Sequence, residues 1–161
     1  MQNMDSMHLT EILQPDSIKV PLIAKGKQSA LFELVDLLVE TTNISAGDKL
    51  REAVWEREQT RTTGIGHGIA IPHGKIKECH QLCMAMGKTA DPIDFGAIDD
   101  KPVSLIILLA SPADQTGPHI QALAQISRML TDQDFRLSLQ QAASASQVYE
   151  LITAQEAKAV A

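Results

Sequence analysis

Two segments in the first third of the chain carry hydrophobic residues at the spacing of an amphipathic helix. The apolar positions of the range Lys27–Thr41 recur every three or four residues: Leu31, Leu34, Val35 and Leu38. Acidic residues fall between them, so this segment is predicted to form a helix with one buried face. A second helix is predicted from Ser45 to about Glu58, because Ser45 and Asp48 have the spacing of a capping box.

Four shorter segments have the composition of β-strands. A short strand is predicted at Ser17–Pro21, and another at Ile69–Ile71 after a run of glycines. The segments Leu82–Lys88 and Val103–Ala110 are almost continuously apolar. Such strands are typical of a sheet that is covered on both faces, so helices are expected on either side of these two.

The last third of the chain has the pattern of three helices. The first opens at Gly117–Pro118, because proline suits the first helical position. Along one stripe it carries Ile120, Leu123, Ala124, Ser127 and Leu130. The other two are predicted near Gln133–Gln141 and Ser146–Ile152. Together the elements predict an α/β fold, a mixed β-sheet flanked by helices on both faces.

The length of 161 residues suits one domain with a sizeable core. We expect this domain to cover residues 9–153, after a disordered N-terminus at residues 1–8. Residues 154–161 show no packing pattern and are expected to form a frayed tail.

Charge and composition narrow the possible partners and location. Lys and Arg number 14 against 20 Asp and Glu, a formal charge of −6, which argues against nucleic acid and anionic membranes as partners. The longest apolar run, Leu105–Ala110, is too short to cross a bilayer, and the N-terminus lacks the features of a signal peptide. A cytoplasmic protein is expected. Cys79 and Cys83 lack a second ligand pair for a metal, so no metal or cofactor is expected.

The range 62–75 carries the strongest chemical signal of the chain. Three glycines alternate with other residues and are followed by a β-type segment, Pro72 and then His73. Closely spaced glycines let backbone N–H groups approach an anion, and a neutral histidine beside them can act as a nucleophile. These residues suggest a histidine that receives a phosphoryl group. A structural turn beside an ordinary histidine remains the alternative.

Arg57 and His119 are further candidates, each with an ordinary structural alternative. Arg57 lies on the inward stripe of its helix, where it either extends past the edge of the core or faces an anion. His119 lies in the first turn of its helix, where the helix dipole favours the neutral ring. A neutral ring can donate one N–H to a phosphoryl oxygen; otherwise His119 is simply a polar residue at a helix start.

The motif Thr63–Lys75 closely resembles the active-site signature of the fructose/mannitol-type EIIA domains of the bacterial phosphotransferase system. It is most like the nitrogen-regulatory branch, EIIA-Ntr. Asp91–Phe95, Asp99–Val103 and Pro112–Thr116 followed by His119 also match, and the resemblance spans roughly Leu9 to Ile152.

The resemblance implies an EIIA type 2 fold and a histidine phosphocarrier. His73 would be phosphorylated, on Nε2, with Arg57 and His119 as the other active-site residues. The donor would be an HPr-like carrier charged from phosphoenolpyruvate, and the phosphorylation state would govern binding to regulatory target proteins. The hydroxyls of Thr62 and Thr63 are candidates for contact with the phosphoryl group.

Two alternatives remain open from the sequence. The first is a sugar-transport EIIA that passes its phosphoryl group to a fructose- or mannitol-specific EIIB. The second, from another class, is a metal-dependent hydrolase built from His67, His73, His80 and His119, although no HExxH motif or carboxylate cluster supports it. In the phosphocarrier hypothesis His8, His67 and His80 have no essential role.

Overall fold

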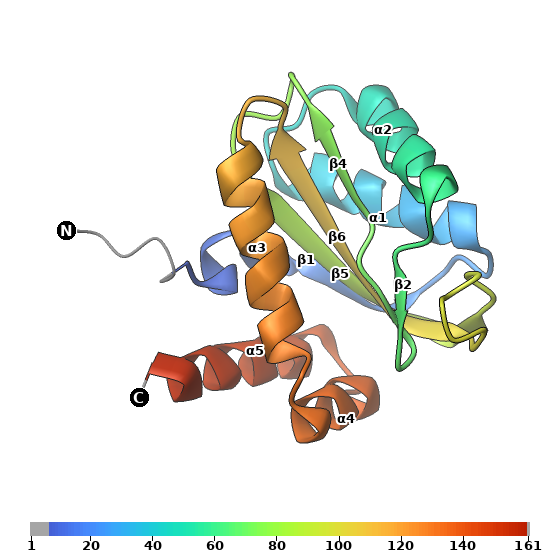
Figure 1. Cartoon of the computed structure of the whole chain (residues 1–161), viewed down its shortest axis with the longest axis vertical. Coiled ribbons are helices and arrows are strands. Elements are labelled where there is room, and N and C mark those ends of the chain that lie inside the picture. Colours follow the sequence, from blue (N-terminus) through green and yellow to red (C-terminus); the bar gives the residue numbers. More distant parts are fainter. Residues whose placement is uncertain (1–6, 161) are drawn as a thin grey trace.

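The computed structural model describes residues 7–160 and shows a mixed sheet between two layers of helices (Figure 1). Within that range the strands are β1 (Leu13–Leu22), β2 (Gly64–Gly66), β3 (Ile69–Ala70), β4 (His73–Ile76), β5 (Cys83–Ile93) and β6 (Val103–Pro112). The helices are α1 (Lys27–Thr41), α2 (Gly47–Thr60), α3 (Thr116–Met129), α4 (Gln133–Gln141) and α5 (Ala145–Val160), and a 3-10 turn covers Leu9–Glu11. The predicted α/β fold is confirmed.

The sheet has the strand order β1-β5-β6-β3-β2, and β4 pairs with β6 beyond the end of β3. Both β3 and β4 run parallel to β6, β3 opposite Leu105–Ile106 and β4 opposite Leu109–Pro112. Pro72 separates the two short strands; it has no N–H to donate, but its carbonyl accepts from the Leu109 N–H at 3.0 Å. One edge of β6 is therefore covered by two successive segments, and the second begins at His73.

The central strand β6 is buried on both faces, as its apolar sequence predicts. Ile106 and Leu108 pack into a core with α1 and α2, whereas Leu105 and Ile107 pack into a second core with α3, α4 and α5. Figure 1 shows α3 crossing in front of the sheet and α1 behind it. None of the helices in the described part of the chain combines the length and the hydropathy that a membrane span needs.

Several element boundaries differ from the sequence predictions. Helix α2 begins at Gly47 with Ala46 as its cap, and no side chain caps it. The capping box of Ser45 and Asp48 was therefore wrong, because the Asp48 carboxylate instead accepts from Arg51 Nη1 at 2.9 Å. Strands β1 and β5 are longer than predicted, because register shifts break the regular alternation along both.

The C-terminal helix also corrects the sequence analysis. Helix α5 continues to Val160 instead of fraying after Thr153. Its Glu156 is 3 % exposed and accepts hydrogen bonds from the backbone N–H groups of Leu9 and Thr10. A buried carboxylate thus anchors a segment that has no hydrophobic pattern. Leu9–Glu11 form a 3-10 turn at this contact. Of residues 1–8, for which disorder was expected, residues 1–6 lie outside the described residues.

Candidate functional site

His73 begins β4, with its side chain on the face of the sheet that α3 covers. Its pairing partner in β6 is Leu109, which packs against Ala122 of α3. In the sequence, His73 follows the strand that is predicted at Ile69–Ile71. That strand instead stops at Ala70; the Ile71 N–H still bonds to the Thr63 carbonyl at 3.0 Å, Pro72 follows, and His73 starts the next strand.

The ring of His73 has a fixed orientation. Its Nδ1 lies 3.0 Å from the carbonyl oxygen of Ile71. A carbonyl oxygen can only accept a hydrogen bond, so Nδ1 carries the proton and Nε2 keeps its lone pair. This leaves Nε2 as the ring nitrogen that could act as a nucleophile, and Nε2 is also the nitrogen that the resemblance implies.

Helix α2 lies directly against β4 at Gly74. A Cβ atom on Gly74 would come within 2.9 Å of Val54 Cγ2 and 3.1 Å of the Val54 backbone nitrogen, so a side chain here would push the helix away. This approach brings the last turn of α2 to His73. Residues of α2, β4 and α3 together line an open pocket of about 600 Å³: Ala53, Glu56, Arg57, Thr60, His73, Gly74, Lys75, His119 and Leu123.

Arg57 lies on the wall of this pocket, in the last turn of α2. Its Nη1 donates to the carbonyl of Arg61 at 2.9 Å, which ties the guanidinium to the end of its own helix. The rest of the planar group can still meet an anion, since guanidinium offers five N–H donors. Arg61 is exposed, as expected of a surface residue.

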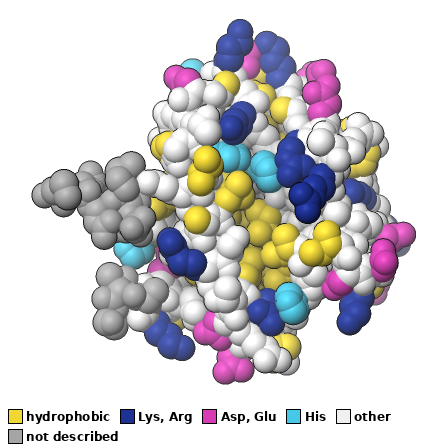
Figure 2. Space-filling view, in the orientation of Figure 1, with side chains coloured by type: hydrophobic (Ala, Val, Ile, Leu, Met, Phe, Trp, Pro, Cys, Tyr) yellow, Lys and Arg dark blue, Asp and Glu magenta, His cyan; other side chains and the backbone are white. Residues whose placement is uncertain are grey.

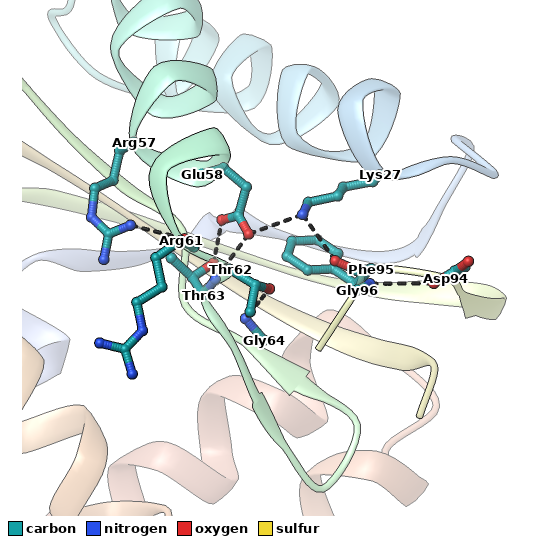
Figure 3. A network of polar contacts seen from close by, with 10 residues as sticks. All are labelled: Lys27, Arg57, Glu58, Arg61, Thr62, Thr63, Gly64, Asp94, Phe95 and Gly96. Atoms are coloured by element: carbon teal, nitrogen blue, oxygen red, sulfur yellow. Dashed lines mark hydrogen bonds and ion pairs between the residues drawn. The ribbon is translucent and has the colours of Figure 1, made fainter. Parts of the chain in front are cut away.

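A buried polar network holds the end of α2 in place (Figure 3). The Glu58 carboxylate accepts from the backbone N–H of Thr63 at 2.8 Å and from the Thr63 hydroxyl at 2.5 Å. Lys27 Nζ lies 3.1 Å from the same carboxylate and also donates to the Phe95 carbonyl at 2.9 Å. A carboxylate at a helix C-terminus opposes the helix dipole. Lys27 and the two donors of Thr63 compensate the negative charge of Glu58. They also fix the chain between Arg57 and the glycine hairpin.

His119 is the second histidine of the pocket and comes from the first turn of α3. Its ring centroid lies 5.2 Å from that of His73, with the two planes at 66°. The side chain is buried, and its Nδ1 lies 2.5 Å from the hydroxyl of Ser111, the buried residue near the end of β6. The structure therefore brings together Arg57, His73 and His119, three residues that are distant in sequence.

Two residues of this neighbourhood were missed by the sequence analysis. Lys75 lines the pocket two positions after His73 on β4, and strand alternation could have placed both side chains on one face. Ser111 is a polar residue directly after the apolar run of β6. Its contact with His119 follows from the docking of α3, for which the sequence holds no local signal.

Burial favours the neutral state of both histidine rings. Burial is the largest effect on each ring: it lowers the pKa of His73 below the ordinary histidine value, with smaller contributions in the same direction from Arg57 and Lys75. The hydrogen bond to Ile71 and the charge of Glu58 act in the opposite direction on His73. Burial, then His73 and Lys75, lower the pKa of His119 to about 4. A neutral His73 keeps the lone pair that a nucleophile needs.

The low pKa of His119 predicts a specific pH dependence of stability. Between pH values of about 6.5 and 4 the unfolded chain binds a proton that folded His119 does not, so the free energy of unfolding should fall as the pH falls through this window. This contribution should be constant above and below it. NMR titration of the ring should give a midpoint near 4. His119→Gln is the control, because it should reduce the slope and leave the contribution of His73; a midpoint near the ordinary value would contradict the prediction.

The glycine run has a different role from the one that the sequence suggested. Gly66 and Gly68 have φ angles of +97° and +75° and form the tip of the β2–β3 hairpin. A Cβ atom on Gly64 would lie 2.7 Å from Ala97. None of the three lines the pocket around His73, so the expected cradle of backbone N–H groups is not formed by these glycines. They permit a tight turn and close packing.

The threonines and the remaining histidines also lie elsewhere. The Thr63 hydroxyl is buried against Glu58, and the Thr62 hydroxyl accepts from the Gly64 N–H at 3.1 Å, so neither serves the pocket. His67 is exposed at the hairpin tip, and His80 lines a separate pocket. Within residues 7–160 no three His, Cys, Asp or Glu side chains gather as metal ligands, which contradicts the four-histidine hydrolase. Cys79 and Cys83 are both buried and free.

The surface above the site combines positive charge with apolar area (Figure 2). Figure 2 shows two neighbouring histidine side chains bordered by Lys and Arg, with a hydrophobic hollow next to them. The rings of His73 and His119 lie edge to face, with their centroids 5.2 Å apart. Although the whole chain has a formal charge of −6, this face concentrates cationic groups around two neutral rings. Such a site is suited to an anionic group carried by another protein.

The sequence of the chain matches the model of a known protein family. The family described as "Phosphoenolpyruvate-dependent sugar phosphotransferase system, EIIA 2" matches residues 11–155. The chain belongs to this family. The resemblance seen in the sequence is thereby confirmed, and the protein is an EIIA component of the phosphotransferase system.

Relatives in both branches of the family are similar to the chain. A nitrogen regulatory protein of Bradyrhizobium diazoefficiens is 34 % identical over 146 residues, covering 91 % of this chain and 95 % of the relative. A fructose-specific EIIA component of Haloferax volcanii is also 34 % identical, over 149 residues, covering 92 % and 97 %. The crystal structure of the nitrogen regulatory protein IIA-Ntr from Neisseria meningitidis has a TM-score of 0.82 at 33 % identity and covers 89 % and 98 %.

Proposed function

We propose that His73 is the phosphoryl-accepting residue of this EIIA component and that the protein is a phosphorylation-dependent regulatory switch. The observation that carries the proposal is the state of the His73 ring. Its Nδ1–H is held by the Ile71 carbonyl at 3.0 Å, which leaves the Nε2 lone pair available beside Arg57, Lys75 and His119.

In the proposed reaction Nε2 of His73 attacks the phosphorus of a phosphohistidine on an HPr-like donor. The new N–P bond forms as the donor's N–P bond breaks, and the electron pair of the broken bond returns to the donor's ring nitrogen. Such a transfer depends on positioning and on compensation of charge. Arg57 and Lys75 would supply positive charge, and His119 would donate one hydrogen bond to a phosphoryl oxygen.

The nitrogen-regulatory branch is the better supported of the two. The relative from Bradyrhizobium diazoefficiens and the structure from Neisseria meningitidis are both nitrogen regulatory proteins. The phosphorylation state of His73 would then control binding to regulatory target proteins in the cytoplasm, without a nucleic-acid partner. The fructose-specific relative favours the second candidate, transfer to a sugar-specific EIIB. Incubation of the phosphorylated chain with a purified fructose EIIB discriminates between the two candidate functions, since a transport EIIA should transfer its phosphoryl group to the EIIB.

Incubation with phosphoenolpyruvate, an EI-type enzyme and an HPr-like carrier tests the function directly. Intact mass should increase by one phosphoryl group only when all three are present. The modification should be labile in acid and stable in base, as expected of a phosphohistidine. A chain that stays unmodified with an active donor would contradict the proposal.

The donor is expected to dock on the apolar surface beside His73. Ile69 of β3 is fully buried and cannot contribute to this surface. Ile65 is 40 % exposed, and the strand register turns it away from the α1–α2 core, to the face that holds His73. Ile120 follows His119 and is 59 % exposed. These two isoleucines are therefore the candidates for donor contact.

Replacing Ile65 or Ile120 with aspartate should slow phosphorylation by the donor, because a charge replaces apolar contact area at the interface. Stopped-time phosphorylation at subsaturating donor measures the effect. Ile23→Asp is the matched control, since Ile23 is 78 % exposed and lies between β1 and α1. Equal slowing in all three variants would show an effect of charge alone, and no slowing would place the donor elsewhere.

A further inference from the structure

The two histidines of the pocket are chemically alike but have different hydrogen-bond partners. His73 Nδ1 faces a backbone carbonyl, whereas His119 Nδ1 faces the hydroxyl of Ser111 at 2.5 Å. Ser111 pairs with Lys75 in the β4–β6 ladder and is fully buried. With Nδ1 turned to β6, Nε2 is the nitrogen of His119 that remains for the pocket.

The tautomer of His119 follows from the single partner of Ser111. Among the described residues, the Ser111 hydroxyl makes one hydrogen bond, the one to His119. If Nδ1 carried the proton, the hydroxyl would accept it and its own O–H would be buried without an acceptor, which is unfavourable. If Nδ1 is unprotonated, the hydroxyl donates and every group is satisfied. The neutral ring then carries its proton on Nε2.

We infer that Ser111 is a positioning residue that determines which of the two histidines accepts the phosphoryl group. By donating to Nδ1 of His119 it holds the Nε2–H tautomer, so this ring presents a donor to the pocket and has no lone pair with which to compete. The Ile71 carbonyl holds the opposite tautomer of His73, which presents a lone pair. The Ile71 carbonyl thus makes His73 the phosphoryl acceptor, and the Ser111 hydroxyl makes His119 the hydrogen-bond donor. This inference rests on the proposed function, but the tautomers can be measured without it.

The first measurement is the ring ¹⁵N NMR spectrum of the unphosphorylated wild-type chain. We expect protonated Nε2 in His119 and protonated Nδ1 in His73. In Ser111→Ala the His119 ring should become a mixture of tautomers, while the His73 signals stay unchanged. Ser111→Thr keeps the hydroxyl and should restore the wild-type pattern. Protonated Nδ1 in wild-type His119 would overturn the inference, whatever the variants do.

The second measurement is phosphorylation from the HPr-like donor. Ser111→Ala should slow transfer by about threefold to tenfold, the equivalent of one neutral hydrogen bond. In a His119→Ala background Ser111→Ala should have no further effect, because a positioning residue acts only through its partner. Equal slowing in both backgrounds would overturn the inference. If no variant or wild-type chain accepts phosphate, the proposed function fails, whereas the NMR result still decides the tautomers.

Discussion

Replacing His73 with alanine is expected to abolish acid-labile phosphorylation while leaving the fold intact. The ring supplies the only neutral Nε2 lone pair that the proposal assigns to the pocket, so no partial activity should remain. The fold should survive because His73 is only half buried and starts a short strand whose backbone pairs with β6. The lost contact, the hydrogen bond to the Ile71 carbonyl, can be replaced by water in an open pocket.

Intact mass after incubation with phosphoenolpyruvate, an EI-type enzyme and an HPr-like carrier measures this effect. His67→Ala is the matched control, since His67 is exposed at the hairpin tip and does not line the pocket. Thermal unfolding of both variants should resemble that of the parent. Phosphate retained by folded His73→Ala, or lost in His67→Ala, would show that the nucleophile has been misassigned.

Arg57→Ala is expected to slow transfer by about 10²–10³-fold, which corresponds to roughly 3–4 kcal/mol in the barrier. The guanidinium is expected to stabilise charge on the transferring group, and it is already oriented by its hydrogen bond to the Arg61 carbonyl at 2.9 Å. Arg57→Lys should recover part of the rate, because it keeps the charge and loses the planar pair of donors.

Stopped-time phosphorylation at saturating donor gives these rates. Arg61→Ala is the control for charge: it removes the same charge from an exposed side chain and leaves intact the carbonyl that Arg57 uses. The control should retain nearly the parent rate. If Arg61→Ala slows transfer as much as Arg57→Ala, the effect comes from the overall positive charge of this surface and not from a direct contact of Arg57 in the pocket.

The parts of the fold that the sequence predicted are those with strong local patterns. The helical spacing of Lys27–Thr41 and the unbroken apolar run of Val103–Ala110 gave α1 and β6 nearly as the structure has them. The prediction of where α5 ends was wrong, because this part of the helix is held by one buried carboxylate, Glu156. The hydrogen-bond partners of that carboxylate lie far away in the sequence. A hydrophobic pattern cannot reveal an element that is held by distant polar contacts.

The parts of the candidate site that could be predicted are those marked by a sequence motif or by the inward face of a helix. Arg57 and His73 were found from the inward stripe of a helix and the residue after a glycine run, and the pocket brings them together. The role given to the glycines was wrong, since φ angles and contact with Ala97 explain them. Ser111 was missed because its meaning depends on how α3 docks on β6, which local sequence does not encode.

The carboxylate of Glu156 connects the N-terminal turn to the C-terminal helix, because its hydrogen bond to Leu9 joins residues 147 positions apart. Figure 1 shows the Leu9–Glu11 turn and the end of α5 on the same side of the molecule. Opening of the Leu9–Glu11 turn would leave the buried carboxylate without its backbone donors, and opening of the end of α5 would leave the Leu9 and Thr10 N–H groups without their acceptor. The two ends therefore form one cooperative unit. Amide hydrogens in the last turns of α5 should exchange together with those of Leu9 and Thr10, and not progressively as at an ordinary helix end.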